Sequence, residues 1–81
     1  MYEHYAVRVS QHKLNRREAG DEEGESFHIL YNYDGDNIGS YYPESHIMIL
    51  SLGGQYLTEY AIKAVADWFR INPDTIDIEY A

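Results

Sequence analysis

The chain has 81 residues, a formal net charge of −8 and no cysteine. This length allows a single domain with one core, which we expect to span residues 1–81, and the lack of cysteine excludes disulfides, thiolate zinc sites and thiol nucleophiles. No apolar run reaches the roughly 18 to 20 residues of a membrane span, and the N-terminal residues lack the features of a signal peptide, so we expect a soluble, cytoplasmic protein.

The charges are distributed unevenly along the chain. Most of the basic residues precede position 18, and residues 18–62 contain no lysine or arginine while carrying many carboxylates. Such an acidic segment would repel a phosphate backbone, which disfavours direct binding of nucleic acid. It would attract a basic protein surface and accelerate the encounter with it. The alternative is that the charge serves only solubility.

The first predicted strand covers residues 5–10, where Tyr5, Val7 and Val9 occupy every second position. This period of two is typical of a half-buried strand. Residues 11–25 follow as a polar segment with two glycines, which predicts a long loop. A mobile tip between two paired strands is favoured for this loop over a working loop.

The second predicted strand spans residues 27–33, in which large side chains again alternate. Phe27 and Ile29 fall on one face together with the tyrosines that follow, whereas Leu30 falls on the other face. This strand therefore offers apolar side chains to both faces of the sheet.

Two further strands are predicted before the helix. Asp34-Gly35 indicates a hairpin turn, because glycine tolerates the positive φ that such turns require. Residues 38–42 are predicted to return as a short third strand that ends at Pro43. Residues 46–52 are apolar on both faces, which is typical of a strand in the middle of a sheet.

Residues 55–70 are predicted to form an amphipathic helix, because their apolar residues recur with the helical period. The apolar stripe is wide and includes Trp68. We expect this side chain to be buried against Val7, Ile29 or Ile78. The outward face carries charges of both signs, which is typical of a solvated surface.

The last predicted strand covers residues 75–80 and has the amphipathic pattern of an edge or near-edge strand. Because a strand that returns through a helix usually runs parallel to the strand before the helix, we expect it to be parallel to residues 46–52. The predicted fold is α+β, with an antiparallel-rich sheet of four to five strands, one helix packed on one face and the order β-β-(β)-β-α-β.

Residues 34–39 begin like a calcium-binding loop, with oxygen-bearing side chains at the first, third and fourth positions and glycine at the sixth. The match then fails, because Ile38 stands where a ligand is needed and Ser45 replaces the glutamate at the twelfth position. A hairpin turn stabilised by its short acidic residues is the favoured interpretation.

No other motif predicts catalysis or a cofactor. The serines lack a nucleophile elbow, and the glycines do not form a phosphate-binding loop. His28 and His46 could meet if their strands pair, and with Glu44 or Glu3 they could imitate a metal site. Polar residues on the sheet are the favoured interpretation of these histidines. We therefore predict a protein that is not an enzyme and has no catalytic, cofactor-binding or metal-binding residues.

In size and charge the chain is similar to the small acidic proteins that phages and mobile elements use against host defence complexes, such as anti-CRISPR and anti-restriction proteins. This similarity implies a non-catalytic inhibitor that occupies a basic, nucleic-acid-binding surface of a partner protein as a nucleic-acid mimic. Aromatic side chains embedded in the acidic segment would supply the anchors of such an interface. The predicted contact residues are Glu22, Glu23, Glu25, Tyr31, Tyr33, Asp34, Asp36, Tyr41, Tyr42 and Glu44.

An alternative is a structural or regulatory subunit that associates with itself. One helix covers one face of a sheet, whereas the predicted strands carry apolar residues on both faces. A two-fold homodimer that buries the second face is a common solution for such an apolar patch.

Overall fold

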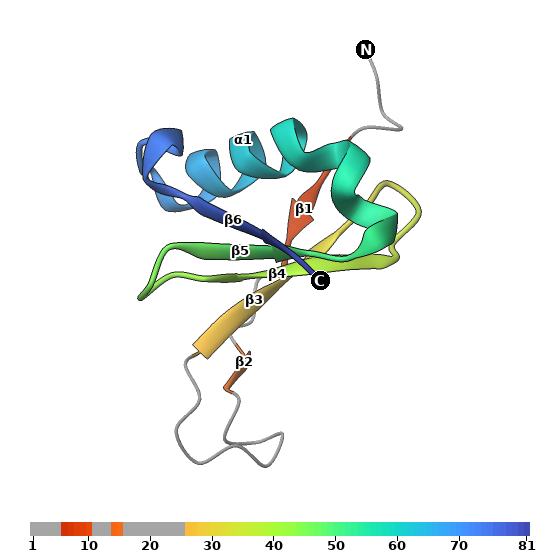
Figure 1. The fold of residues 1–81 in the computed structure, drawn as a ribbon, viewed down its shortest axis with the longest axis horizontal. Coiled ribbons are helices and arrows are strands. Elements are labelled where there is room, and N and C mark those ends of the chain that lie inside the picture. Colours follow the sequence, from red (N-terminus) through yellow and green to blue (C-terminus); the bar gives the residue numbers. More distant parts are fainter. Residues whose placement is uncertain (1–5, 11–13, 16–25) are drawn as a thin grey trace.

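The computed structural model of the chain describes residues 6–10, 14–15 and 26–81 (Figure 1). The elements along the chain are β1 (Arg8–Val9), β2 (Leu14–Asn15), β3 (Ser26–Tyr31), β4 (Asn37–Tyr42), β5 (Ile47–Leu50), the 3-10 helix η3 (Leu52–Leu57), α1 (Thr58–Phe69), the 3-10 helix η4 (Pro73–Thr75) and β6 (Asp77–Tyr80).

The strands form one sheet in the order β1-β3-β4-β5-β6; β1 pairs with the end of β3, and β2 pairs with its start. All pairs are antiparallel except β5 with β6. Helix α1 lies across one face of this sheet (Figure 1). The predicted α+β fold is therefore confirmed, as are the parallel final strand and its position at the edge of the sheet.

The core lies between α1 and the face of the sheet that carries Leu30. Strand pairing aligns this residue with Val9 on β1, with Gly39 on β4 and, through Gly39, with Leu50 on β5. A second row crosses the same face, and its partners are His28, Tyr41, Met48 and Ile78. The helical side of the core consists of Leu57, Ala61, Val65 and Ala66. Phe69 completes the contact, because its ring centroid lies 5.1 Å from that of Tyr41 and 5.1 Å from that of His28.

The structure corrects the predicted place of Trp68, whose side chain is 48% exposed. The adjacent Phe69 packs onto the sheet in its stead. Successive residues of an α-helix are rotated by about 100°, so the two rings cannot both point at the sheet. Ile29 is also not a core partner of this helix, because it lies on the opposite face of β3 from the buried Leu30.

The boundaries of the predicted helix also differ from the structure. The chain enters it through η3, so the α-helix begins at Thr58, and its C-cap Arg70 adopts a left-handed conformation with φ of 55°. Gly54 is buried in η3, where an added Cβ would lie 2.6 Å from the carbonyl oxygen of Ile38. This close approach explains why glycine occupies the junction between the sheet and the helix.

The predicted hairpin turn is present between β3 and β4. Gly35 has φ of 86°, and its N–H donates to the carbonyl oxygen of Asn32 at 3.1 Å. The Asn32 side chain accepts a further hydrogen bond from the N–H of Asp36 at 2.9 Å. The side chain that stabilises this turn is thus an amide and not one of the two aspartates.

The N-terminal predictions are tested only in part. Of the predicted strand at residues 5–10, Arg8–Val9 forms strand β1, and Tyr5 lies outside the described residues. Within the predicted loop at residues 11–25, Leu14–Asn15 pairs with β3 as β2, which corrects the prediction of a continuous loop. The remaining residues of that loop also lie outside the described residues.

Candidate functional site

The predicted contact residues do not form one cluster. Tyr31, Tyr33, Asp34 and Asp36 lie at the β3–β4 turn, whereas Tyr42 and Glu44 lie at the opposite end of β4. The six residues of β4 separate the two groups by roughly 17 to 20 Å at about 3.3 Å per residue. Glu22, Glu23 and Glu25 lie outside the described residues.

Tyr41, one of the predicted contact residues, lies in the core. Its side chain is 1% exposed and packs against Phe69 under the helix. Burial raises the pKa of its hydroxyl above the ordinary value of 10.0, because the phenolate would lose its hydration. The alternation of β4 places the neighbouring Tyr42 on the other face, where its ring lies 5.4 Å from that of Phe27.

The histidines of the described residues do not come together. His28 is buried, and its Nδ1 donates to the carbonyl oxygen of Ser10 at 2.8 Å. His46 lies in the β4–β5 turn with its Nδ1 3.3 Å from the Thr75 hydroxyl oxygen. His28 lies in β3 and His46 directly precedes β5, and β4 lies between these two strands. Within residues 6–10, 14–15 and 26–81, no three His, Cys, Asp or Glu side chains are grouped so that they could hold a metal ion.

The sheet face opposite α1 is the first candidate surface, and we call it the open face. Its apolar members come from three adjacent strands and are all half-buried. They are Phe27, Ile29, Tyr42, Ile47 and Ile49. No described helix covers these side chains, since α1 packs on the other face. An apolar patch that spans several strands is typical of a protein-binding surface.

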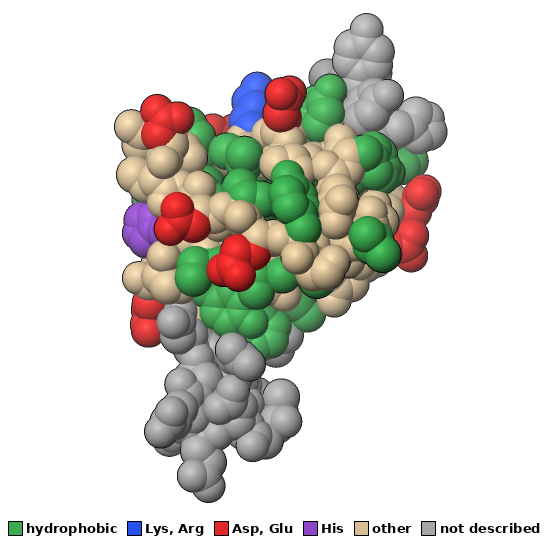
Figure 2. Space-filling model, viewed as in Figure 1, with side chains coloured by type: hydrophobic (Ala, Val, Ile, Leu, Met, Phe, Trp, Pro, Cys, Tyr) green, Lys and Arg blue, Asp and Glu red, His purple; other side chains and the backbone are tan. Residues whose placement is uncertain are grey.

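Two carboxylates border the open face along β6. Asp77 pairs with Ile47 and Glu79 pairs with Ile49, so each carboxylate ends a row of side chains that crosses the sheet. Both are exposed. Acidic side chains lie next to hydrophobic ones in the view of Figure 2. We call Asp77 and Glu79 the acidic rim.

Sequence reasoning did not select the acidic rim as part of a site. The alternation of residues 75–80 places both carboxylates on one side of the last strand, which is the signal that could have found them. The pattern alone does not say which apolar residues lie beside them, because that depends on the parallel pairing with β5.

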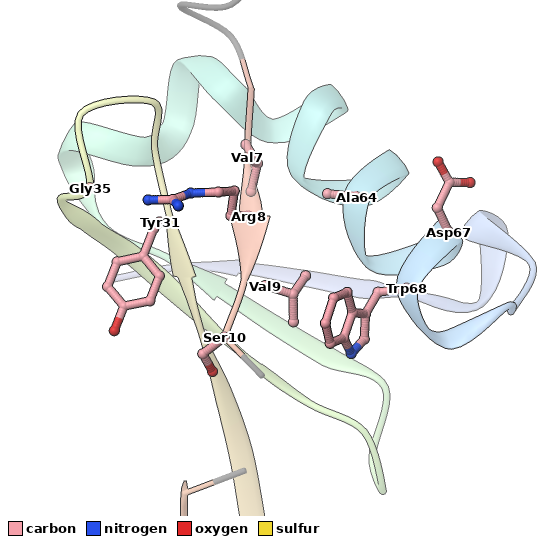
Figure 3. Close-up of a pocket in the computed structure, with 9 residues that line it drawn as sticks. All are labelled: Val7, Arg8, Val9, Ser10, Tyr31, Gly35, Ala64, Asp67 and Trp68. Atoms are coloured by element: carbon pink, nitrogen blue, oxygen red, sulfur yellow. The ribbon is translucent and has the colours of Figure 1, made fainter. Parts of the chain in front are cut away.

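A groove beside β1 is the second candidate surface (Figure 3). It has a volume of about 720 Å³ and is lined by residues 7–10 around β1, by the last residue of β3, by the β3–β4 turn and by α1. Trp68 and Ala64 of α1 lie on one side of β1, whereas Arg8 and Tyr31 extend on the other side (Figure 3). We call this surface the β1 groove.

None of the helices in the described part of the chain has the length and apolar character needed to cross a membrane. No protein-family model matches the chain, and comparisons with curated proteins and with solved structures find no significant match.

Proposed function

We propose that this protein is a non-catalytic binding protein whose open face and acidic rim dock onto a basic surface of a partner protein. The observation that carries the proposal is the pairing across β5 and β6, which sets Asp77 beside Ile47 and Glu79 beside Ile49. An apolar centre with a charged border is the usual composition of a protein interface. The net charge of −8 adds long-range attraction to a basic partner.

A basic surface that otherwise binds nucleic acid is the partner surface we favour. Lysine and arginine supply most of the affinity for a phosphate backbone, so such surfaces carry the charge opposite to that of this chain. The aromatic members of the open face, Phe27 and Tyr42, would supply rigid contact area within the same footprint.

The experiment is affinity capture from host lysates at low and high salt, with wild-type protein and two variants. Ile49→Ser removes an apolar side chain from the open face, and Leu52→Ser makes the same kind of change at a residue that is 81% exposed in η3. We expect salt-sensitive capture of a nucleic-acid-binding protein by wild type and by Leu52→Ser, and weaker capture by Ile49→Ser. Equal capture by all three proteins would refute the open face as the contact surface.

Self-association through the open face is the second candidate function. The specific observation in its favour is that β5, an interior strand, carries Ile47 and Ile49 on this face as well as core residues on the other. Mutual repulsion of two copies of charge −8 opposes it, most strongly at low salt. Sedimentation velocity across micromolar concentrations distinguishes the two, because a dimer would be disrupted by Ile49→Ser and strengthened by added salt.

A further inference from the structure

We propose that the β1 groove is a second docking site, which takes an extended peptide segment of a partner protein as an additional strand beside β1. This site lies at the opposite edge of the sheet from the acidic rim and does not depend on the function proposed above. Strand β1 ends the sheet, so its outer edge has no neighbouring strand among the described residues.

The hydrogen bonds of β1 show which backbone groups point to that edge. The N–H of Ser10 donates to the carbonyl oxygen of Ile29 at 2.9 Å, and the N–H of Ile29 donates to the hydroxyl oxygen of Ser10 at 3.0 Å, so the backbone groups of this pair point toward each other. In an antiparallel ladder such pairs alternate with pairs whose N–H and C=O groups point away from each other. Val9, opposite Leu30, is therefore a residue whose backbone N–H and C=O point outward.

The two sides of the groove differ in chemistry, and an added strand would present alternate side chains to them. Towards α1, the groove offers Val9, Ala64 and the half-exposed ring of Trp68, and the carboxylate of Asp67 lies on the same side. Arg8 and Tyr31 lie on the other side (Figure 3). There the guanidinium of Arg8 would meet the peptide side chains that point away from α1. The matching peptide alternates apolar residues with acidic ones, because a carboxylate complements Arg8.

The opposite edge of the sheet is less suited to an added strand. There β6 carries Asp77 and Glu79, both exposed, and charges on an edge strand are a common protection against pairing. At the β1 edge the exposed aromatic ring of Trp68 lies beside the outward backbone groups. Aromatic rings of this kind are frequent anchors of peptide and protein interfaces.

The test begins with a displayed library of random decapeptides, selected on the immobilised full chain. Selected peptides are then titrated against wild type, Trp68→Ala and Tyr56→Ala. The last is the matched control, because Tyr56 is an exposed aromatic residue of η3 outside the groove. We expect the selected peptides to alternate apolar and acidic residues. Their affinity should fall about tenfold or more for Trp68→Ala and stay unchanged for Tyr56→Ala. Arg8→Gln should weaken peptides that carry a carboxylate and leave their amide versions unchanged.

Backbone pairing is tested on the peptide, which avoids any effect on folding of the chain. N-methylation removes a single amide donor, so every second position should lose about tenfold or more in affinity, while the positions between should tolerate the change. Failure to select any peptide, equal binding by Trp68→Ala, or tolerance of N-methylation at all positions would overturn the proposal. Unchanged peptide binding by Ile49→Ser would separate this site from the open face.

Discussion

At the scale of single residues, Phe69 and Trp68 show how two adjacent aromatic side chains take different roles. Phe69 contacts Tyr41 and His28 on the sheet, whereas Trp68 is half exposed beside β1. We expect Phe69→Ala to lower the free energy of unfolding by about 3 kcal/mol, because it removes packing from the core. Trp68→Ala should lower it by less than about 1 kcal/mol. Urea unfolding followed by far-ultraviolet circular dichroism measures both, and a larger loss for Trp68→Ala would contradict this assignment.

The buried Tyr41 makes the stability of the protein depend on pH in the alkaline range. Burial raises the pKa of this hydroxyl in the folded state above its ordinary value of 10.0. The unfolded chain therefore loses this proton first as the pH rises. The stabilisation is complete below about pH 10, and it is lost as the pH rises from there towards the raised pKa.

The measurement is urea unfolding at a series of pH values between about 8 and 11, which brackets the ordinary tyrosine pKa. Compared with wild type, we expect Tyr41→Phe to show a smaller fall in the free energy of unfolding above about pH 10. Tyr42→Phe is the matched control, since Tyr42 lies on the open face of the same strand. An identical pH dependence in wild type and Tyr41→Phe would show that other groups cause the fall.

At the scale of elements, the junction between β5 and α1 depends on one of two adjacent glycines. An added Cβ at Gly54 would collide with the backbone of Ile38, whereas one at Gly53 would meet no atom within 4 Å. We expect Gly54→Ala to cost about 1 to 3 kcal/mol, because η3 must move away from β4. Gly53→Ala should change the free energy of unfolding by less than about 0.5 kcal/mol. Similar melting temperatures for the two variants would mean that η3 can move away from β4 without lowering the stability of the protein.

The types of element were predictable from the sequence, because long periodic segments carry a strong signal. The helix around Ala61 and Val65, the turn at Gly35 and the parallel return of the last strand all follow from local pattern. The choice between Phe69 and Trp68 did not follow, since both fit a wide apolar stripe. It depends on where the sheet lies beneath the helix, which is a property of strand pairing and not of the helix sequence.

The candidate surfaces were predictable only in part. That the second face of the sheet is apolar follows from the pattern of residues 46–52. The acidic rim does not, because the pairing of Asp77 with Ile47 joins residues far apart in the chain. The β1 groove needed the structure as well, since Arg8 and Trp68 line one groove only after the helix has packed beside β1.

At the scale of the whole molecule, the proposed docking depends on where the negative charge acts. The net charge of −8 attracts any basic surface, but a docking interface requires that particular carboxylates border the contact. In the described part of the chain, two pairs of carboxylates can be replaced with the same change in net charge, so that only their positions differ. Asp77 and Glu79 border the open face, whereas Asp34 and Asp36 lie at the β3–β4 turn.

The most direct measurement is the association rate with a captured partner at low salt, for two charge-reversed proteins. One carries Asp77→Lys and Glu79→Lys, and the other carries Asp34→Lys and Asp36→Lys, so both have the same net charge. Because charges next to a contact act most strongly on encounter, we expect the rim reversal to slow association about tenfold more than the turn reversal and to flatten its salt dependence. Equal slowing by the two proteins, or stronger slowing by the turn reversal, would contradict docking through the open face and its acidic rim.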